Sequence, residues 1–359
     1  MTAPLSRRAL LQVAGAASLS LVGCSAGFAK TQRIIDPRRF GARGDGRTDD
    51  TRALQRAIDM AEGGGIVDVP AGVYLIDAKH SLVLRNGVHL RLAQGAELHA
   101  IPNELPRAYV LLIQRVSDVK VTGGRIVGER DRHMGTTGEW GHGIAIYGGV
   151  RVAIRDIRIE RCWGDGISIG GKKSSKTQLN PSTDIEIANI TCVGNRRQGL
   201  SVGRSRRVWV HDSTFTDTGG TPPSAGIDVE PDKGDITKDV RIERCVCKRN
   251  RGPGIQVWHD TFDVEIRDCT LEENRNTGIL AVGAKDLLIR NNRIRNNRNV
   301  GIALRKKTGN VTISGNVLDG NAPGRPRASR NGRDPRWARH LEVAPDVVAV
   351  RVADDNRLD

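Results

Sequence analysis

A short motif recurs along this chain and limits the folds that it can adopt. It reads Gly, an aliphatic residue, any residue and a second aliphatic residue, and its copies lie 23 to 33 residues apart. They begin at Gly143, Gly166, Gly199, Gly226, Gly254, Gly278 and Gly301. A second run of alternating aliphatic residues follows each copy, and most of these runs are followed by Asp or Asn, which tolerate tight turns. Such a period indicates the stacked coils of a solenoid.

The repeat predicts an all-β fold, a right-handed parallel β-helix, because connections between parallel strands are nearly always right-handed. Weaker copies at Val88–Leu92 and Val119–Gly128 extend the coils toward the N-terminus, so we expect the solenoid to run from about residue 66 to 322. The 42 glycines suit a β-rich chain with many turns. Residues 323–359 begin as a Pro-, Gly- and Arg-rich stretch, and we predict a loosely ordered basic tail with a short strand near Val347–Ala353.

A helix is expected before the coils, since Leu54, Ala57, Ile58 and Ala61 recur at helical spacing and Gly63–Gly65 ends the pattern. Asp45, Asp49 and Asp50 are assigned to turns and helix caps. The run FGARGDGRTDDT at 40–51, together with VPAGVYLI at 69–76, resembles the opening of the pectate-lyase-like β-helix superfamily. That superfamily includes polysaccharide lyases, mannuronan epimerases and polygalacturonases. The resemblance implies one domain over residues 36–322, capped by the helix, and a carbohydrate-active protein, but selects none of these activities.

The first 30 residues carry signals for export. Arg7 and Arg8 precede an apolar run, Ala9–Val22, that is too short to span a membrane, as in twin-arginine export signals. The stretch LVGC at 21–24 resembles the lipobox of bacterial lipoproteins, which implies a lipid on Cys24, whereas ordinary cleavage near Gly27–Lys30 is the alternative. Both routes predict a periplasmic, lipid-anchored or secreted protein that touches a membrane only through Cys24.

The net charge of +15 at pH 7 favours a polyanionic partner. Since export separates the protein from most nucleic acid, we expect an acidic polysaccharide as partner, no nucleic acid, and a monomer.

Aligning the coils gathers polar residues on one outer face. The first outward column reads Ala145, Ser168, Ser201, Asp228, Gln256, Leu280 and Ala303, and the next reads Tyr147, Gly170, Gly203, Glu230, Trp258, Val282 and Arg305. Asp228 and Glu230 share one strand face because side chains alternate along a strand. Insertions at 172–183, 218–224 and 231–238 surround this pair and would wall a cleft above it, although polar ladders outside a β-helix also occur without a function.

The candidate site residues come from these columns and their neighbours. The predicted catalytic residues are Asp228, Glu230, His259, Arg204 and Asp165, and the predicted substrate-binding residues are Trp258, Gln256, Ser201, Lys233 and Tyr147. Trp258 would offer a stacking face for a sugar. His142 stands further from the acid pair, and His211 is interpreted as structural.

Two chemistries suit this set. Proton abstraction at C5 of a uronate, by a lyase or an epimerase, is preferred; Asp228 and Glu230 would bind the substrate carboxyl group or a Ca²⁺ ion, and His259, Arg204 or Lys233 would be the base. Glycoside hydrolysis by paired carboxylates is the alternative. A non-catalytic glycan-binding or structural β-helix is the third hypothesis.

Family motifs bear on this choice. Gly226–Asp228 is similar to the Gly-aromatic-Asp of mannuronan epimerases, which implies a catalytic role for Asp228, but the tyrosine and histidine that flank that motif are absent here. Polygalacturonases also carry a Gly-Ile-Asp coil, yet the Gly-His-Gly at 141–143 precedes it in this chain instead of following it.

The cysteines follow the coil register. Cys192 and Cys247 fall in an inward column of the second strand, and Cys245 and Cys269 lie one above the other on adjacent coils. Stacked strands are roughly 4.8 Å apart, which allows a disulfide between Cys245 and Cys269, although buried free thiols are favoured and no zinc spacing is found.

Overall fold

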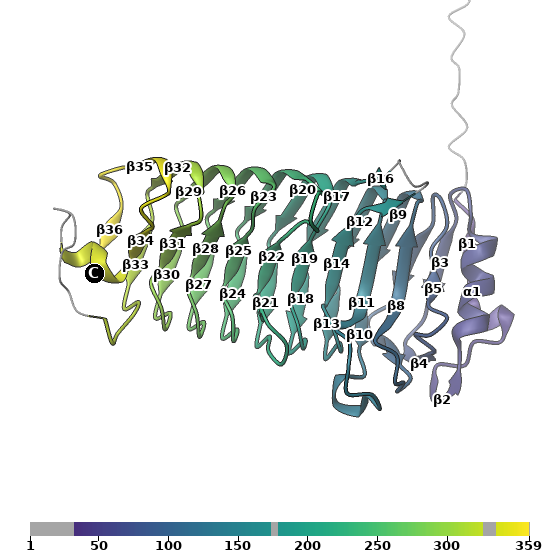
Figure 1. Cartoon of the computed structure of the whole chain (residues 1–359). Helices are drawn as coiled ribbons and strands as arrows, with labels where there is room; N and C mark the ends of the chain where they lie inside the picture. Colours follow the sequence, from purple (N-terminus) through teal and green to yellow (C-terminus); the bar gives the residue numbers. More distant parts are fainter. Residues whose placement is uncertain (1–31, 174–178, 326–334, 359) are drawn as a thin grey trace, which may run out of the picture. The chain divides into compact units, whose positions relative to one another are not determined.

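The structure is a computed structural model that describes residues 32–173, 179–325 and 335–358. Its strands stack as three long parallel sheets joined by turns, which confirms the predicted β-helix (Figure 1). The export signal and Cys24 lie outside the described residues, so export and lipidation stay predictions. No helix among the described residues is long and apolar enough to cross a membrane.

Each coil contributes one strand to each of three sheets, which we call sheets A, B and C. Sheet A contains, in spatial order, β1 (Ile34–Ile35), β3 (Ile66–Val69), β6 (His89–Leu92), β9 (Ser117–Thr122), β12 (Val150–Arg155), β17 (Ser182–Ala188), β20 (Ser205–His211), β23 (Thr237–Glu243), β26 (Thr261–Arg267), β29 (Lys285–Arg290), β32 (Gly309–Ser314) and β35 (Val348–Val352). Sheet B contains β2 (Asp45–Asp49), β4 (Gly72–Ile76), β7 (Ala96–Ala100), β10 (Arg125–Val127), β13 (Arg158–Glu160), β18 (Thr191–Val193), β21 (Thr214–Thr216), β24 (Val246–Lys248), β27 (Thr270–Glu272), β30 (Arg293–Arg295), β33 (Val317–Asp319) and β36 (Arg357–Leu358).

Sheet C carries the glycine-led motif. It contains β5 (Leu82–Val83), β8 (Arg107–Gln114), β11 (Trp140–Tyr147), β14 (Ile167–Gly170), β19 (Leu200–Val202), β22 (Ile227–Val229), β25 (Ile255–Val257), β28 (Ile279–Val282), β31 (Ile302–Arg305) and β34 (Leu341–Val343). A short antiparallel hairpin, β15 (Lys172–Lys173) with β16 (Leu179–Asn180), lies in the first predicted insertion. The 3-10 helices are η1 (Pro37–Phe40), η2 (Arg130–Arg132) and η3 (Pro335–Arg339).

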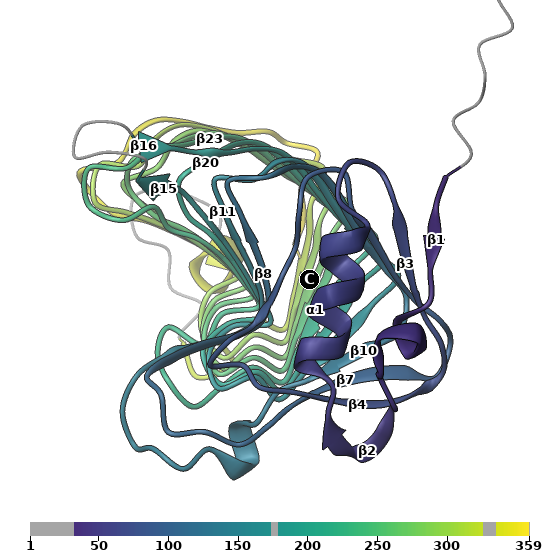
Figure 2. The ribbon, with the colours of Figure 1, turned by 90° about the vertical axis from the view of Figure 1, so that its right-hand side faces the viewer.

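The predicted helix is α1 (Thr51–Met60), and Figure 2 shows it across the end of the first coils. Leu54, Ala57 and Ile58 are buried, as their spacing predicts. Asp50 is the N-cap but accepts no capping hydrogen bond; its carboxylate accepts the backbone N–H groups of Arg43 and Gly44 instead, and so holds the preceding loop.

The solenoid continues past residue 322, where the sequence analysis ended it. The strand expected near Val347–Ala353 is β35, which pairs with β32, while β34 and β36 extend sheets C and B. The chain beyond residue 334 therefore adds a last coil to the stack, because its aliphatic residues continue the inward columns of all three sheets, and the prediction of a loose tail is wrong for this part.

The coil interior is filled by aliphatic columns in the predicted register. The inward column of sheet B pairs one above the other, and all of its members are fully buried. They are Ile159, Cys192, Phe215, Cys247, Leu271, Ile294 and Leu318. Burying each such side chain contributes roughly 1.5–3 kcal/mol. Cys245 and Cys269 also stack, and the backbone N–H of Cys245 lies 3.4 Å from Sγ of Cys269; both are buried free thiols, as favoured above.

Buried asparagines form a ladder at the turns between sheets B and C. Each side-chain Oδ1 of Asn274, Asn297 and Asn321 accepts the backbone N–H of the asparagine one coil earlier. Each Nδ2 donates to a backbone carbonyl, such as that of Cys247 for Asn274. The asparagines that were expected to permit tight turns thus have a second role. Their side chains form hydrogen bonds with backbone groups in the stack that would otherwise lack partners.

We expect Asn274→Ala to lower the free energy of unfolding by about 2 kcal/mol, because it leaves buried backbone N–H and C=O groups without partners. Urea unfolding monitored by circular dichroism measures this difference. Asn299→Ala, which removes an exposed amide that donates to Asn276 Oδ1, is the matched control and should change stability by less than about 0.5 kcal/mol. Equal losses in the two variants would contradict the role assigned to the ladder.

Candidate active site on the outer face of sheet C

The predicted outward column exists on sheet C. Neighbouring strands pair Ala145 with Ser168, Ser168 with Ser201, Ser201 with Asp228, and Asp228 with Gln256, followed by Leu280 and Ala303. Ile227 and Val229 belong to the core, so the alternation of β22 directs Asp228 away from it. Sequence periodicity therefore predicted which residues of distant coils lie side by side.

Asp228 is covered by amide side chains. Gln198 Nε2 donates to its Oδ2 at 2.6 Å, Gln256 Nε2 donates to its Oδ1 at 3.0 Å, and the residue is only 1% exposed. The open cleft floor expected at this position is thus absent, because Gln198 and Gln256 fill the space above the carboxyl group.

The Asp228 carboxyl group lies beside that of Glu230. Their carboxyl groups are hydrogen-bonded to each other; burial raises the pKa of Asp228 to about 8, and the negative charge of Glu230 adds to the effect. At pH 7 the Asp228 carboxyl group is therefore mostly protonated. Glu230 is half-buried, so it is the more accessible member of the pair.

Asp165 and Arg197 form a second charged pair beside Asp228. Arg197 Nη1 donates to Asp165 Oδ2 at 3.1 Å, and Ser201 Oγ donates to the same oxygen at 2.8 Å. Burial raises the pKa of Asp165 to about 6, although Arg197 and Ser201 oppose this effect. The Arg197 side chain is 19% exposed and also lies 3.6 Å from Glu139 Oε2. The Arg197 guanidinium group is thus held by the buried Asp165 and is partly exposed to solvent.

An aromatic group adjoins this pair on β8 and β11. His142 Nδ1 accepts the backbone N–H of Asp165 at 3.0 Å, and burial, followed by the charges of Arg197 and Arg107, lowers the pKa of His142 to about 3. The ring is therefore neutral and carries its proton on Nε2. Tyr109 stacks on it with ring centroids 5.6 Å apart.

Tyr147 completes the network. Its ring meets Tyr109 edge-on, and its hydroxyl donates to Ser168 Oγ at 3.4 Å. Burial raises the pKa of Tyr147, so the phenol stays protonated. Gly170 makes room for the ring, since a Cβ at Gly170 would lie 3.2 Å from it.

The structure brings together only part of the predicted set. Asp228, Glu230, Asp165, Gln256, Ser201 and Tyr147 belong to the network described above. His259 is instead bonded to Asp260 at 2.9 Å, Arg204 is paired with Asp235, and Lys233 is exposed. Trp258 packs beside Leu280 and Val282. His211 pairs with Glu186 and Asp212 on sheet A, which agrees with a structural role.

Sequence reasoning missed Arg197 and Gln198 and placed His142 too far from the site. Arg197 and Gln198 lie in the turn that leads into β19, whereas His142 lies within β11; the period aligns the backbone at these positions, but the side chains reach across to other coils. The only signal was their position: Arg197 and Gln198 precede Gly199, in the coil next to Asp228.

The expected Ca²⁺ does not fit this arrangement. Both oxygens of Asp228 accept amide N–H groups, and its raised pKa disfavours the ionised carboxylate that would bind a cation. Within the part of the chain that the structure describes, no three His, Cys, Asp or Glu residues are grouped as metal ligands.

Comparison with known proteins extends these observations. A family model described as right handed beta helix region matches residues 71–238 and 224–325, and a second, rhamnogalacturonase A/epimerase, pectate lyase-like, matches residues 34–91. The chain is 26% identical over 327 residues to the uncharacterized protein YclG of Bacillus subtilis, covering 81% of this chain and 56% of that protein. It therefore spans only about half of this relative.

Mannuronan C5-epimerase AlgE4 of Azotobacter vinelandii is 34% identical over 139 residues, which cover 34% of this chain and 24% of that protein. The structure of its A-module superposes with a TM-score of 0.64 at 18% identity, covering 90% of this chain and 99% of the module. A tailspike capsular polysaccharide depolymerase of the Acinetobacter baumannii bacteriophage Fri1 gives a TM-score of 0.66 at 16% identity, over 92% of this chain and 59% of that one. At these identities the superpositions show a common fold.

Proposed function

Since the chain belongs to the family of right-handed β-helix proteins, we propose that it is an enzyme acting on an acidic, uronate-containing polysaccharide by removing the C5 proton, as a lyase or an epimerase. The observation that carries this proposal is the solvent-reaching Arg197 beside the Asp228–Glu230 pair. A fixed cation that neutralises the substrate carboxyl group and a carboxylate base are groups that this chemistry uses.

Each group has a defined task in the proposed reaction. Arg197 binds the carboxylate of the sugar and offsets the charge that develops on it. Glu230 takes the proton from C5, and the C–H electron pair passes into the substrate carboxyl group. In a lyase the C4–O4 bond then breaks and O4 takes a proton from solvent; in an epimerase a solvent proton returns to C5 from the opposite face.

Buried residues position Arg197 and Glu230. Asp165 holds Arg197, and the backbone N–H of Asp165 is held in turn by His142. Protonated Asp228 bonds Glu230, and Gln198 and Gln256 orient Asp228. The neutral His142 is a hydrogen-bond donor through Nε2 and does not act as the base.

Glycoside hydrolysis is the second candidate, favoured by one observation. The pKa values of Asp228 and Asp165, about 8 and about 6, differ enough for one protonated and one ionised carboxyl group to coexist at pH 7. Asp228 and Glu230 cannot be the acid and nucleophile together, because hydrogen-bonded carboxyl groups are closer than the roughly 5–9.5 Å that glycosidases use.

Incubating the purified protein with alginate and polygalacturonate tests the proposal. A lyase produces the ultraviolet absorbance of an unsaturated uronate, and an epimerase changes the sugar configuration seen by nuclear magnetic resonance without shortening the polymer. A hydrolase produces reducing ends without that absorbance. Hydrolysis alone would replace the proposal by the second candidate, and no change in any polyuronate would reject both.

Arg197→Gln is expected to lower kcat/KM on the polyuronate about 300-fold, since it removes the cation that faces the developing charge. Initial rates measure the loss, and circular dichroism checks the fold because Asp165 loses its partner. Arg206→Gln removes the same charge from an exposed site of the same coil on sheet A and should leave the rate unchanged. Retention of more than a fifth of the activity in folded Arg197→Gln would contradict the assignment.

A further inference from the structure

Three exposed arginines stand in a row at one edge of sheet C. Arg251, Arg275 and Arg298 each follow an asparagine of the buried ladder. The backbone N–H of Arg275 donates to the carbonyl of Asn250, and that of Arg298 to the carbonyl of Asn274, so the arginines lie on consecutive coils. Their backbones are therefore about 4.8 Å apart. On each coil the buried asparagine therefore fixes the position of the arginine that follows it.

These arginines carry uncompensated charge. Among the residues that the structure describes, no ion pair or side-chain hydrogen bond involves their guanidinium groups. Two other arginines of these coils are neutralised, since Arg249 pairs with Asp217 and Arg295 pairs with Glu272. Each of the three coils thus presents an exposed, unpaired guanidinium group at the same position, in the turn that leads into sheet C.

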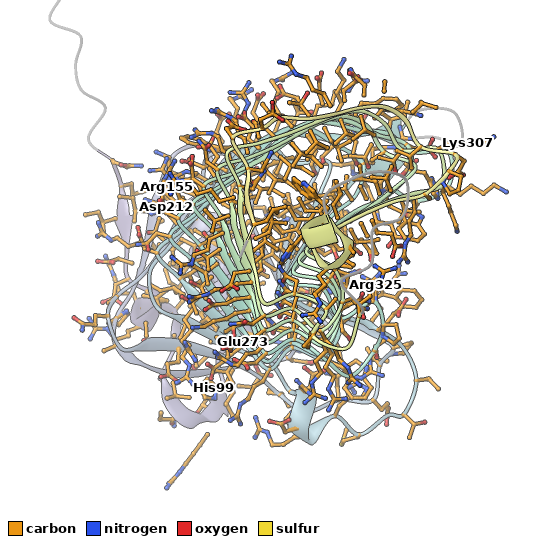
Figure 3. All side chains as sticks on the ribbon, turned by 90° about the vertical axis from the view of Figure 1, so that its left-hand side faces the viewer. His99, Arg155, Asp212, Glu273, Lys307 and Arg325 are labelled. Carbon is orange, nitrogen blue, oxygen red and sulfur yellow. The ribbon has the colours of Figure 1, made fainter. Side chains whose placement is uncertain are left out.

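The row leads to a cavity at the C-terminal end of the same face. The cavity has a volume of about 460 Å³, and its lining includes Arg298, Arg305, Arg325, Glu342, Val300 and Ala322. Glu342 Oε1 lies 2.6 Å from Arg305 and Oε2 lies 2.8 Å from Arg325, so one carboxylate orients two guanidinium groups. Three positive charges against one negative charge leave the cavity suited to an anion. Figure 3 shows Arg325 on the same side of the coils as Lys307, away from Arg155 and Asp212.

The cavity is in register with the candidate active site. Asp228 on β22 and Ala303 on β31 belong to one outward column and are separated by three strand spacings, or about 14 Å. Trp258, Leu280 and Val282 lie between them as an apolar stretch, with the Lys306 ammonium 5.6 Å from the Trp258 ring. Aromatic and apolar side chains suit the faces of sugar rings.

We propose that the arginine row and this cavity bind successive carboxylates of one polysaccharide chain, which lies along the solenoid axis from Arg197 toward Arg325. The choice of a uronate polymer rests on the proposed function. Binding along the track requires no turnover, so the two proposals can fail separately. The track makes the affinity depend on polymer length and on salt, because distant sugars add ionic contacts.

Calorimetric titration with alginate and polygalacturonate tests the track at low and high salt, using trisaccharides, long oligomers and carboxyl-reduced long oligomers. For the uronate that binds, the triple variant Arg251→Gln, Arg275→Gln, Arg298→Gln should bind long oligomers about 30-fold more weakly than the unmodified protein, because exposed charge contacts contribute up to about fivefold each. Trisaccharide binding should not change, and carboxyl-reduced oligomers should bind weakly to both proteins.

Arg293→Gln is the matched control for Arg298→Gln, since both remove an exposed arginine from the same coil but on different faces. Equal weakening by the two single variants, or unchanged long-oligomer binding by the triple variant, would overturn the track, as would the absence of any uronate binding. Arginine-dependent binding without turnover would keep the track and reject the enzymatic proposal. Turnover together with binding that does not depend on these arginines would keep the enzymatic proposal and reject the track.

Discussion

Glu230→Gln is expected to lower kcat on a uronate polymer by about 10³- to 10⁴-fold, because it removes the base that takes the C5 proton. Asp228→Asn should cost less than about tenfold at pH 7, since the protonated carboxyl group and the amide both donate a hydrogen bond to Glu230. Initial rates with saturating substrate measure both effects.

The comparison between the two variants separates the proposed mechanisms. In glycoside hydrolysis Asp228 is the protonated acid, so Asp228→Asn would then abolish turnover and Glu230→Gln would cost less. That order of effects would reject proton abstraction by Glu230. Asp232→Asn, at an exposed position after the same strand, is the control for the loss of one carboxylate and should retain full activity.

The second large effect concerns stability against pH. The pKa of Asp228 rises from 3.8, its ordinary value, to about 8 in the folded protein through burial and the nearby Glu230 charge. The folded protein therefore holds one more proton than the unfolded chain between about pH 4 and pH 8, and stability falls as pH rises through this range. Above pH 8 the stability that comes from protonated Asp228 is lost, because the carboxyl group is then ionised in both the folded and the unfolded state.

Asp228→Asn removes this dependence. We expect the variant to gain stability relative to the unmodified protein as pH rises from 4 to 8, by about 5 kcal/mol in total. Urea unfolding at several pH values measures the difference, and Asp232→Asn should follow the unmodified protein throughout. Parallel curves for Asp228→Asn and the unmodified protein would show that Asp228 is ionised in the folded state.

Much of the candidate site was predictable because residues one period apart in the sequence lie side by side in a solenoid. Ser201, Asp228 and Gln256 lie 27 or 28 residues apart and still pair directly on β19, β22 and β25. The burial of Asp228 was not predictable, since it depends on Gln198, whose side chain reaches over from a turn. Arg204 and His259 were misplaced for a related reason: their loop neighbours Asp235 and Asp260 offer closer partners.

The amino-acid sequence by itself determined the coil register, the inward columns and the outward order of residues on sheet C. Strand alternation and the glycine-led period are local properties that every coil repeats, so they need no knowledge of the loops. Only the tertiary structure decided that Asp165 holds Arg197, that His142 is neutral, and that Asp228 keeps a proton. These features arise where side chains from different coils together exclude water from a charged group. Such burial depends on how whole turns pack against one another, whereas the sequence period determines only which strand residues are aligned.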